Sequence, residues 1–123
     1  MTLALGGTIQ SMPGLGDQSA RQYTFVTQDT DGRVGDPGAN SVITGILQNK
    51  PAATDRAAAI QIDGVSKLVL GGTASQGDRL KTDTSGAGVA TTTASDNVGA
   101  VALEDGVSGD TIAVRVMPYA FGA

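Results

Sequence analysis

The stretch VLGGTASQGDRLKTDTSGAGV, residues 69–89, contains the pattern from which the fold of this chain is predicted. Short runs alternate apolar and polar residues, and segments rich in Gly, Asp and Ser separate them. Alternation with a period of two places the apolar side chains on one face of a β-strand. The stretch therefore predicts short strands joined by tight turns.

Parts of this pattern also occur earlier in the chain. Two motifs occur twice: LGGT at 5–8 and 70–73, and Asp-Thr-x-Gly at 29–32 and 83–86. After each Asp-Thr-x-Gly come an apolar run, a turn with an Asp, and a second apolar run. The shared order predicts that residues 3–63 and 68–117 are two degenerate copies of one β-unit. The alternative is that strand and turn signals recur in any all-β chain without a duplication.

Other segments have the same alternation and the same kind of turn. TIAVRV at 111–116 and AAAIQI at 57–62 each place apolar residues on one side of a strand. The pairs that we expect at tight turns with positive φ are Asp31-Gly32, Asp63-Gly64, Ser85-Gly86 and Ser108-Gly109. Short strands at roughly 8–12-residue spacing are typical of small antiparallel folds. We predict an all-β protein, either a small antiparallel β-barrel or a sandwich, built from the two repeats.

Residues 1–22 differ from the rest of the chain. They contain Pro13, several Gly and few large apolar residues, and they show no strand periodicity. Segments of this composition are either disordered or become ordered on a partner. We therefore predict an extended N-terminal arm at 1–22 and a single β-domain at 23–123.

The composition argues against catalysis. The chain has no His, no Cys and no Trp, so the commonest general base and the thiolate nucleophile are both missing. The acidic residues are almost all Asp, which is typical of solvated turns. The segment at 29–32 resembles the start of a calcium loop, but its Gly comes too early and Asn40 occupies position twelve. We predict that the protein is not an enzyme and has no cofactor and no metal site.

Charge and hydropathy exclude two kinds of partner. The formal net charge is −4, and the basic residues are scattered along the sequence without a run. A surface that follows nucleic-acid phosphates needs clustered Lys and Arg, so we expect no nucleic-acid partner. The apolar stretches are much shorter than the roughly 20 residues that span a bilayer, so we expect no membrane segment.

Three segments carry a resemblance to a known family: GILQNKPA at 45–52, IDGVSKLVLGG at 62–72, and GAVALEDGVSGDTIAVRV at 99–116. The chain resembles the small capsid decoration, or cement, proteins of tailed bacteriophages over residues 22–118. The resemblance implies a β-rich virion protein, made in the cytoplasm of the bacterial host. Such a protein binds the outer surface of an icosahedral head and stabilises the lattice of the major capsid protein, often as a homotrimer.

Contact with the capsid or with another copy is expected from the arm and from the two Tyr-x-Phe segments. The candidate contact residues are Thr2, Leu3, Leu5, Ile9, Met12, Leu15, Arg21, Tyr23, Tyr119 and Phe121. The aromatic residues among them have an alternative role as lids on the ends of the core. A different function is also compatible with this fold, namely a tail, baseplate or fibre adaptor subunit of a phage-like assembly. A carbohydrate-binding module is less consistent with the sequence, because the chain has no Trp for stacking on sugar rings.

Overall fold

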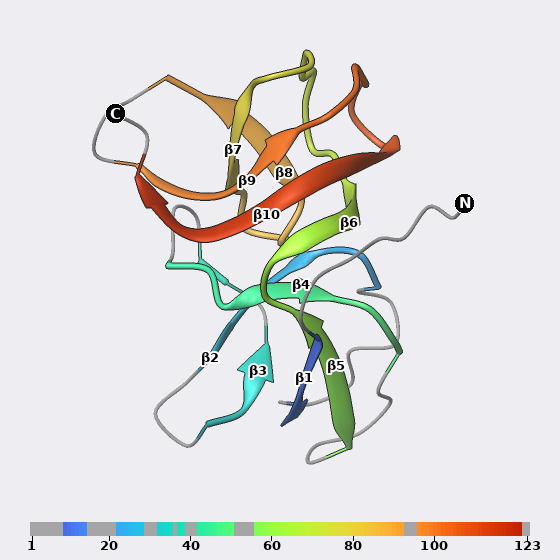
Figure 1. Ribbon diagram of the computed structural model, residues 1–123, viewed down its shortest axis with the longest axis vertical. Helices are drawn as coiled ribbons and strands as arrows, with labels where there is room; N and C mark the ends of the chain where they lie inside the picture. The colour runs from blue at the N-terminus through green and yellow to red at the C-terminus, as the bar shows by residue number, and fades with distance from the viewer. Residues whose placement is uncertain are drawn as a thin grey trace.

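The computed structural model describes most of the chain. The described residues are 9–14, 22–28, 32–35, 37–38, 42–50, 56–92 and 96–121, with the backbone alone at 117–121. These residues form ten β-strands and no helix. The described part of the chain therefore contains no helical membrane span. The strands make two antiparallel five-stranded sheets, which lie one above the other along the long axis of the molecule (Figure 1). The predicted all-β class is confirmed, and the sheets, which are not closed into a barrel, are consistent with a sandwich.

The first sheet is formed by the N-terminal half of the chain. Its strands lie in the order β1 (Ile9–Pro13), β5 (Ala57–Gln61), β4 (Gly45–Leu47), β2 (Phe25–Gln28) and β3 (Val34–Gly35). All neighbouring strands are antiparallel. Side chains from all five strands meet in one apolar cluster: Val26, Val34, Leu47, Ala58 and Ile60 are buried, and Met12 packs against them.

The second sheet is formed by the C-terminal half. Its strands lie in the order β6 (Gly64–Val69), β10 (Thr111–Phe121), β9 (Asn97–Ala102), β7 (Arg79–Thr82) and β8 (Gly88–Thr91). Burial alternates along the strands, as expected for a sheet with one apolar face. In β7, for example, Leu80 and Thr82 are buried, whereas Arg79 is exposed.

The two sheets have the same strand order and matching registers. The pair Phe25↔Ile46 in the first sheet occupies the place of Arg79↔Val101 in the second. A single parallel bridge links the first and last strands in each sheet, Gly14↔Val34 in one and Leu70↔Gly88 in the other. Each sheet therefore curls around its own apolar side chains. The repeat boundaries at 3–63 and 68–117 remain a prediction.

The two LGGT motifs differ in their position along the sequence relative to the corresponding strands. By the register, β1 corresponds to β6. The second LGGT follows β6, whereas the first precedes β1 in the sequence. The Asp-Thr-x-Gly motifs do correspond, because each follows the second strand of its half, and Gly32 and Gly86 both have positive φ. Gly64 and Gly109 also have the positive φ expected at these turns.

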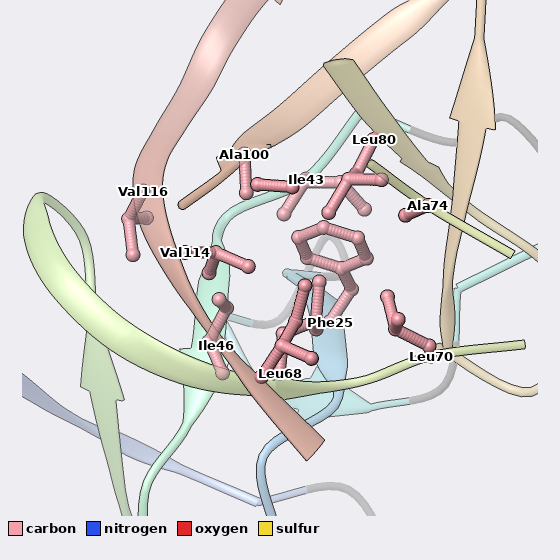
Figure 2. Close-up of a cluster of buried hydrophobic side chains, with 12 residues drawn as sticks. Phe25, Ile43, Ile46, Leu68, Leu70, Ala74, Leu80, Ala100, Val114 and Val116 are labelled. Atoms are coloured by element: carbon pink, nitrogen blue, oxygen red, sulfur yellow. The ribbon is translucent and has the colours of Figure 1, made fainter. Parts of the chain in front are cut away.

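Phe25 joins the two halves of the molecule. Its neighbour Val26 points into the first-sheet cluster, and Phe25 points the opposite way, into the core of the second sheet. Figure 2 shows its ring surrounded by Leu68, Leu70, Leu80 and other apolar side chains of the C-terminal half. A Cβ on Gly99 would lie 2.6 Å from a ring atom of Phe25, so the close approach at this point requires glycine.

Part of the predicted arm forms an edge strand. Ile9–Pro13 pair with β5 over five residues, from Ile9↔Gln61 to Pro13↔Ala57. The rest of the arm, except Gly14 and Gln22, lies outside the described residues. The division between arm and body at residue 22 remains a prediction.

We expect the substitution Phe25→Ala to lower the free energy of unfolding by about 3–5 kcal/mol, because it leaves a cavity where the two halves meet. The measurement is urea unfolding followed by circular dichroism. The control is Val42→Ala, since Val42 is 65% exposed and should change stability by less than about 0.5 kcal/mol. Equal midpoints for the two variants would contradict the assigned role of Phe25.

We expect deletion of residues 2–14 to destabilise the protein, because it removes β1 and the packing of Met12 against the first-sheet cluster. Deletion of residues 2–8 keeps β1 and should leave the unfolding temperature close to that of the full chain. Thermal unfolding of both truncations makes the comparison. The same unfolding temperature in both would mean that β1 does not contribute to the stability of the body.

Candidate interaction surfaces

The predicted contact residues are described to different degrees. Ile9, Met12 and Tyr23 have described side chains, while Tyr119 and Phe121 belong to β10, of which only the backbone is described there. The remaining predicted contact residues lie outside the described part of the chain: Thr2, Leu3, Leu5, Leu15 and Arg21. The role of all ten in contact with a partner remains a prediction.

Ile9 and Met12 lie on the edge strand β1 but differ in their surroundings. Ile9 is 57% exposed and is one of the large apolar side chains on the surface. Met12 is partly buried against the cluster formed by the first sheet. Ile9 is therefore available for contact with another molecule, whereas Met12 contributes mainly to internal packing.

Tyr23 connects the two halves through its backbone. It has a left-handed conformation with φ of +66°, which is uncommon for a residue with a side chain. Its N–H donates to the carbonyl of Leu47 at 2.7 Å, and its carbonyl accepts from the N–H of Val69 at 2.8 Å. The Nζ atom of Lys67 lies 5.6 Å from the centre of the ring, within the range of a cation–π contact. Tyr23 thus links the two halves through its backbone, which the sequence alone did not indicate.

Further hydrogen bonds between the halves lie beside Tyr23. The N–H of Phe25 donates to the carbonyl of Gly86 at 2.8 Å. The side-chain amide of Gln48 donates to the hydroxyl of Ser66 at 2.8 Å. Together with the Phe25 ring, these bonds fix the orientation of one sheet relative to the other.

The loops at the top of Figure 1 form the end of the molecule that is farthest from the first sheet. The loop after β6 and the loop after β9 are joined by the antiparallel bridge Ala74↔Gly106. Asp105 accepts from the N–H of Gln76, and Asp110 accepts from the N–H of Val107. These acidic side chains therefore hold the turns together, and the side chain of Val107 remains 54% exposed.

Asp96 forms a charged pair close to the end of β7. Its carboxylate accepts a hydrogen bond from the Thr91 hydroxyl and lies 3.0 Å from the Nζ atom of Lys81. The hydrogen bond from Thr91 lowers the pKa of Asp96, and Lys81 lowers it further, while desolvation acts in the opposite direction. The charged carboxylate is thus favoured in the folded state.

The described residues offer little for chemistry. They contain no group of three or more His, Cys, Asp or Glu side chains placed to hold a metal ion. An open depression of about 280 Å³ lies on the second sheet and is lined by Gly77, Asp78, Arg79, Thr91 and Thr92. Absence of enzyme activity remains a prediction.

The fold brings together basic residues that are far apart in the sequence. Arg115 in β10 pairs with Val101 in β9, and Val101 pairs with Arg79 in β7. Both arginines are exposed and Val101 is half-buried. Sequence analysis missed this row, because the order of strands in a sheet cannot be read from spacing along the chain. The period-two alternation of TIAVRV, which leaves Arg115 on the outer face, was the only available signal.

Comparison with known proteins gives a structural likeness and no sequence match. The sequence matches no protein-family model, and no curated protein sequence matches it. The fold is similar to a solved structure described as the N base of the head fibre gp8.5 of bacteriophage phi29, with a TM-score of 0.66. The two share 16% sequence identity, and the match covers 91% of this chain and 97% of the other. At this level of sequence identity, the similarity shows a shared fold and nothing beyond it.

We expect the substitution Asp96→Asn to destabilise the protein at pH 7 and to have less effect in acid. Because the pKa of Asp96 is lowered from 3.8 on folding, its contribution is present above that value and is lost as the pH falls through the folded pKa. Urea unfolding of wild type and variant at several pH values measures the difference. Lys81→Met is the partner variant, and the double variant should lose less than the sum of the single changes. If the difference in unfolding free energy between wild type and variant stayed the same at every pH, the lowered pKa of Asp96 would be contradicted.

Proposed function

We propose that this protein is a structural component of a tailed-bacteriophage virion and binds the outer surface of the head. The observation that carries the proposal is the likeness of the fold to the base of a phage head fibre over nearly the whole of both chains. The resemblance of residues 22–118 to capsid decoration proteins points independently to the same location. The neighbour is described as part of a head fibre, and the resemblance implies a protein on the outer surface of a head.

The properties of the body suit such a role. Two sheets joined by the Phe25 ring and by hydrogen bonds of Tyr23 and Phe25 make a rigid unit. A protein that stabilises a shell needs a rigid body and contact surfaces, and it needs no reactive groups. Binding of many copies to one shell increases the total strength of attachment even where each contact is weak.

The proposed partner is the major capsid protein, whose lattice the bound protein would stabilise. We extend the proposal to a homo-oligomer, with a trimer as the expected form, and to contacts made by the N-terminal arm and by Ile9. Synthesis in the host cytoplasm and assembly onto the exterior of the capsid complete the proposal. Of the alternative, a tail, baseplate or fibre adaptor subunit, the tail and baseplate roles are less favoured, because the structural neighbour is described as part of a head fibre; the same description is compatible with a fibre adaptor.

The test is co-sedimentation of the purified protein with expanded, empty heads that lack it. We expect saturable binding, with a number of copies per head that follows the symmetry of the shell. Tails purified from the same phage are the control and should bind none. A folded sample that binds tails and not heads would overturn the proposal in favour of an adaptor.

A further inference from the structure

In the first sheet, one face of the β-unit is covered by the C-terminal half of the same chain. The row Gln61, Ile46 and Phe25 crosses three neighbouring strands, β5, β4 and β2. All three side chains are buried. Phe25 and Ile46 pack into the core of the second sheet, and the side-chain amide of Gln61 donates to the carbonyl of Val65 at 2.7 Å. The C-terminal half therefore covers the whole row.

The equivalent row of the second sheet has a different character. By the matching registers, Arg115, Val101 and Arg79 stand where Gln61, Ile46 and Phe25 stand in the first sheet. Both arginines are exposed and Val101 is half-buried. The face that buries apolar residues in the first half thus presents two guanidinium groups on either side of an apolar side chain in the second half.

The strands around this row carry cations, and the nearby carboxylates of Asp78, Asp96 and Glu104 each accept a hydrogen bond from the protein itself. The outward-facing positions of the five strands hold no carboxylate and four cations, which are Lys67, Arg79, Lys81 and Arg115. These four cations are half of the eight basic residues of the chain, although its net charge is −4. Lys81 is partly neutralised by Asp96, whereas Arg115 and Lys67 are exposed.

We infer that the row Arg115, Val101 and Arg79 is a docking surface for a protein partner that presents carboxylates around an apolar contact. The inference rests on the proposed function, since the partner is the protein surface to which the chain attaches in the virion. Guanidinium groups bind carboxylates through two parallel hydrogen bonds, and Val101 supplies the apolar contact between them. The depression lined by Arg79 and Thr91 adjoins the row and can receive a side chain of the partner.

A protein surface fits this row better than a nucleic acid. The row holds two guanidinium groups, whereas a surface that follows a phosphate backbone needs a longer track of clustered cations. The outward positions of these strands, up to Val116, carry no aromatic side chain on which a base could stack. A carboxylate-bearing protein surface needs neither a long basic track nor a stacking platform.

The test compares two double variants that have the same change in charge. Arg79→Glu with Arg115→Glu alters the row, and Lys50→Glu with Arg56→Glu alters exposed cations beside the connection between β4 and β5 in the other half. Each double variant makes the net charge four units more negative. Circular dichroism and thermal unfolding verify that both are folded.

The first readout is retention on a carboxymethyl resin at pH 7 and low salt, which needs no phage component. The two double variants have the same net charge, so a difference between them reports the position of the charges; we expect the Arg79/Arg115 variant to elute ahead of the Lys50/Arg56 variant. Equal elution of the two variants would overturn the inference. Retention of the wild type on double-stranded DNA, lost in the Arg79/Arg115 variant, would also overturn it and assign the row to nucleic acid.

The second readout is co-sedimentation with the expanded heads. We expect the Arg79/Arg115 variant to lose about tenfold or more in bound copies at equal concentration, and the Lys50/Arg56 variant to bind as the wild type does. Undiminished binding by the Arg79/Arg115 variant would overturn the docking row and leave the proposed function intact. If the wild type binds no heads, the proposed function fails, and the resin comparison alone decides whether the row selects carboxylates.

Discussion

The insertion of Phe25 from the first sheet into the core of the second is the interaction on which the structure depends. Small β-sheets with one apolar face are only marginally stable unless that face is covered. Each half of this chain curls its sheet around its own apolar side chains, and Phe25 adds a shared core between them. The absence of a side chain at Gly99 gives the ring its space. The relative orientation of the two sheets follows from this contact and from the hydrogen bonds beside it.

The two halves have the same topology but different roles. Strand order corresponds, and so does the register up to Val116 in β10, after which the pairing with β9 shifts. One loop contact is also repeated. Asn49 accepts from the N–H of Ala59, and Glu104 accepts from the equivalent N–H of Ala113, each at 2.9 Å. Yet the first sheet places Phe25 where the second places Arg79. One copy therefore supplies the internal interface and the other leaves the same face open to solvent.

This asymmetry connects the fold to the proposed role on a phage head. A structural protein of this kind needs a unit that does not deform and a surface that a partner can recognise. The buried contacts between the halves make the unit rigid. In our proposal, the outer face of the second sheet is the recognition surface, because it gathers cations on an otherwise acidic protein. The loops at the far end are held by their own acidic side chains and keep their shape without a partner.

The sequence by itself determined the all-β class, the alternation of the strands and the turns at Gly32, Gly64, Gly86 and Gly109, because these features depend on neighbouring residues and on backbone conformation. Only the tertiary structure decided that Phe25 belongs to the core of the other half. It also decided that Arg79 and Arg115 flank Val101. These relations depend on which strands pair and in what register, and pairing between distant segments is set by packing of the whole molecule rather than by local pattern.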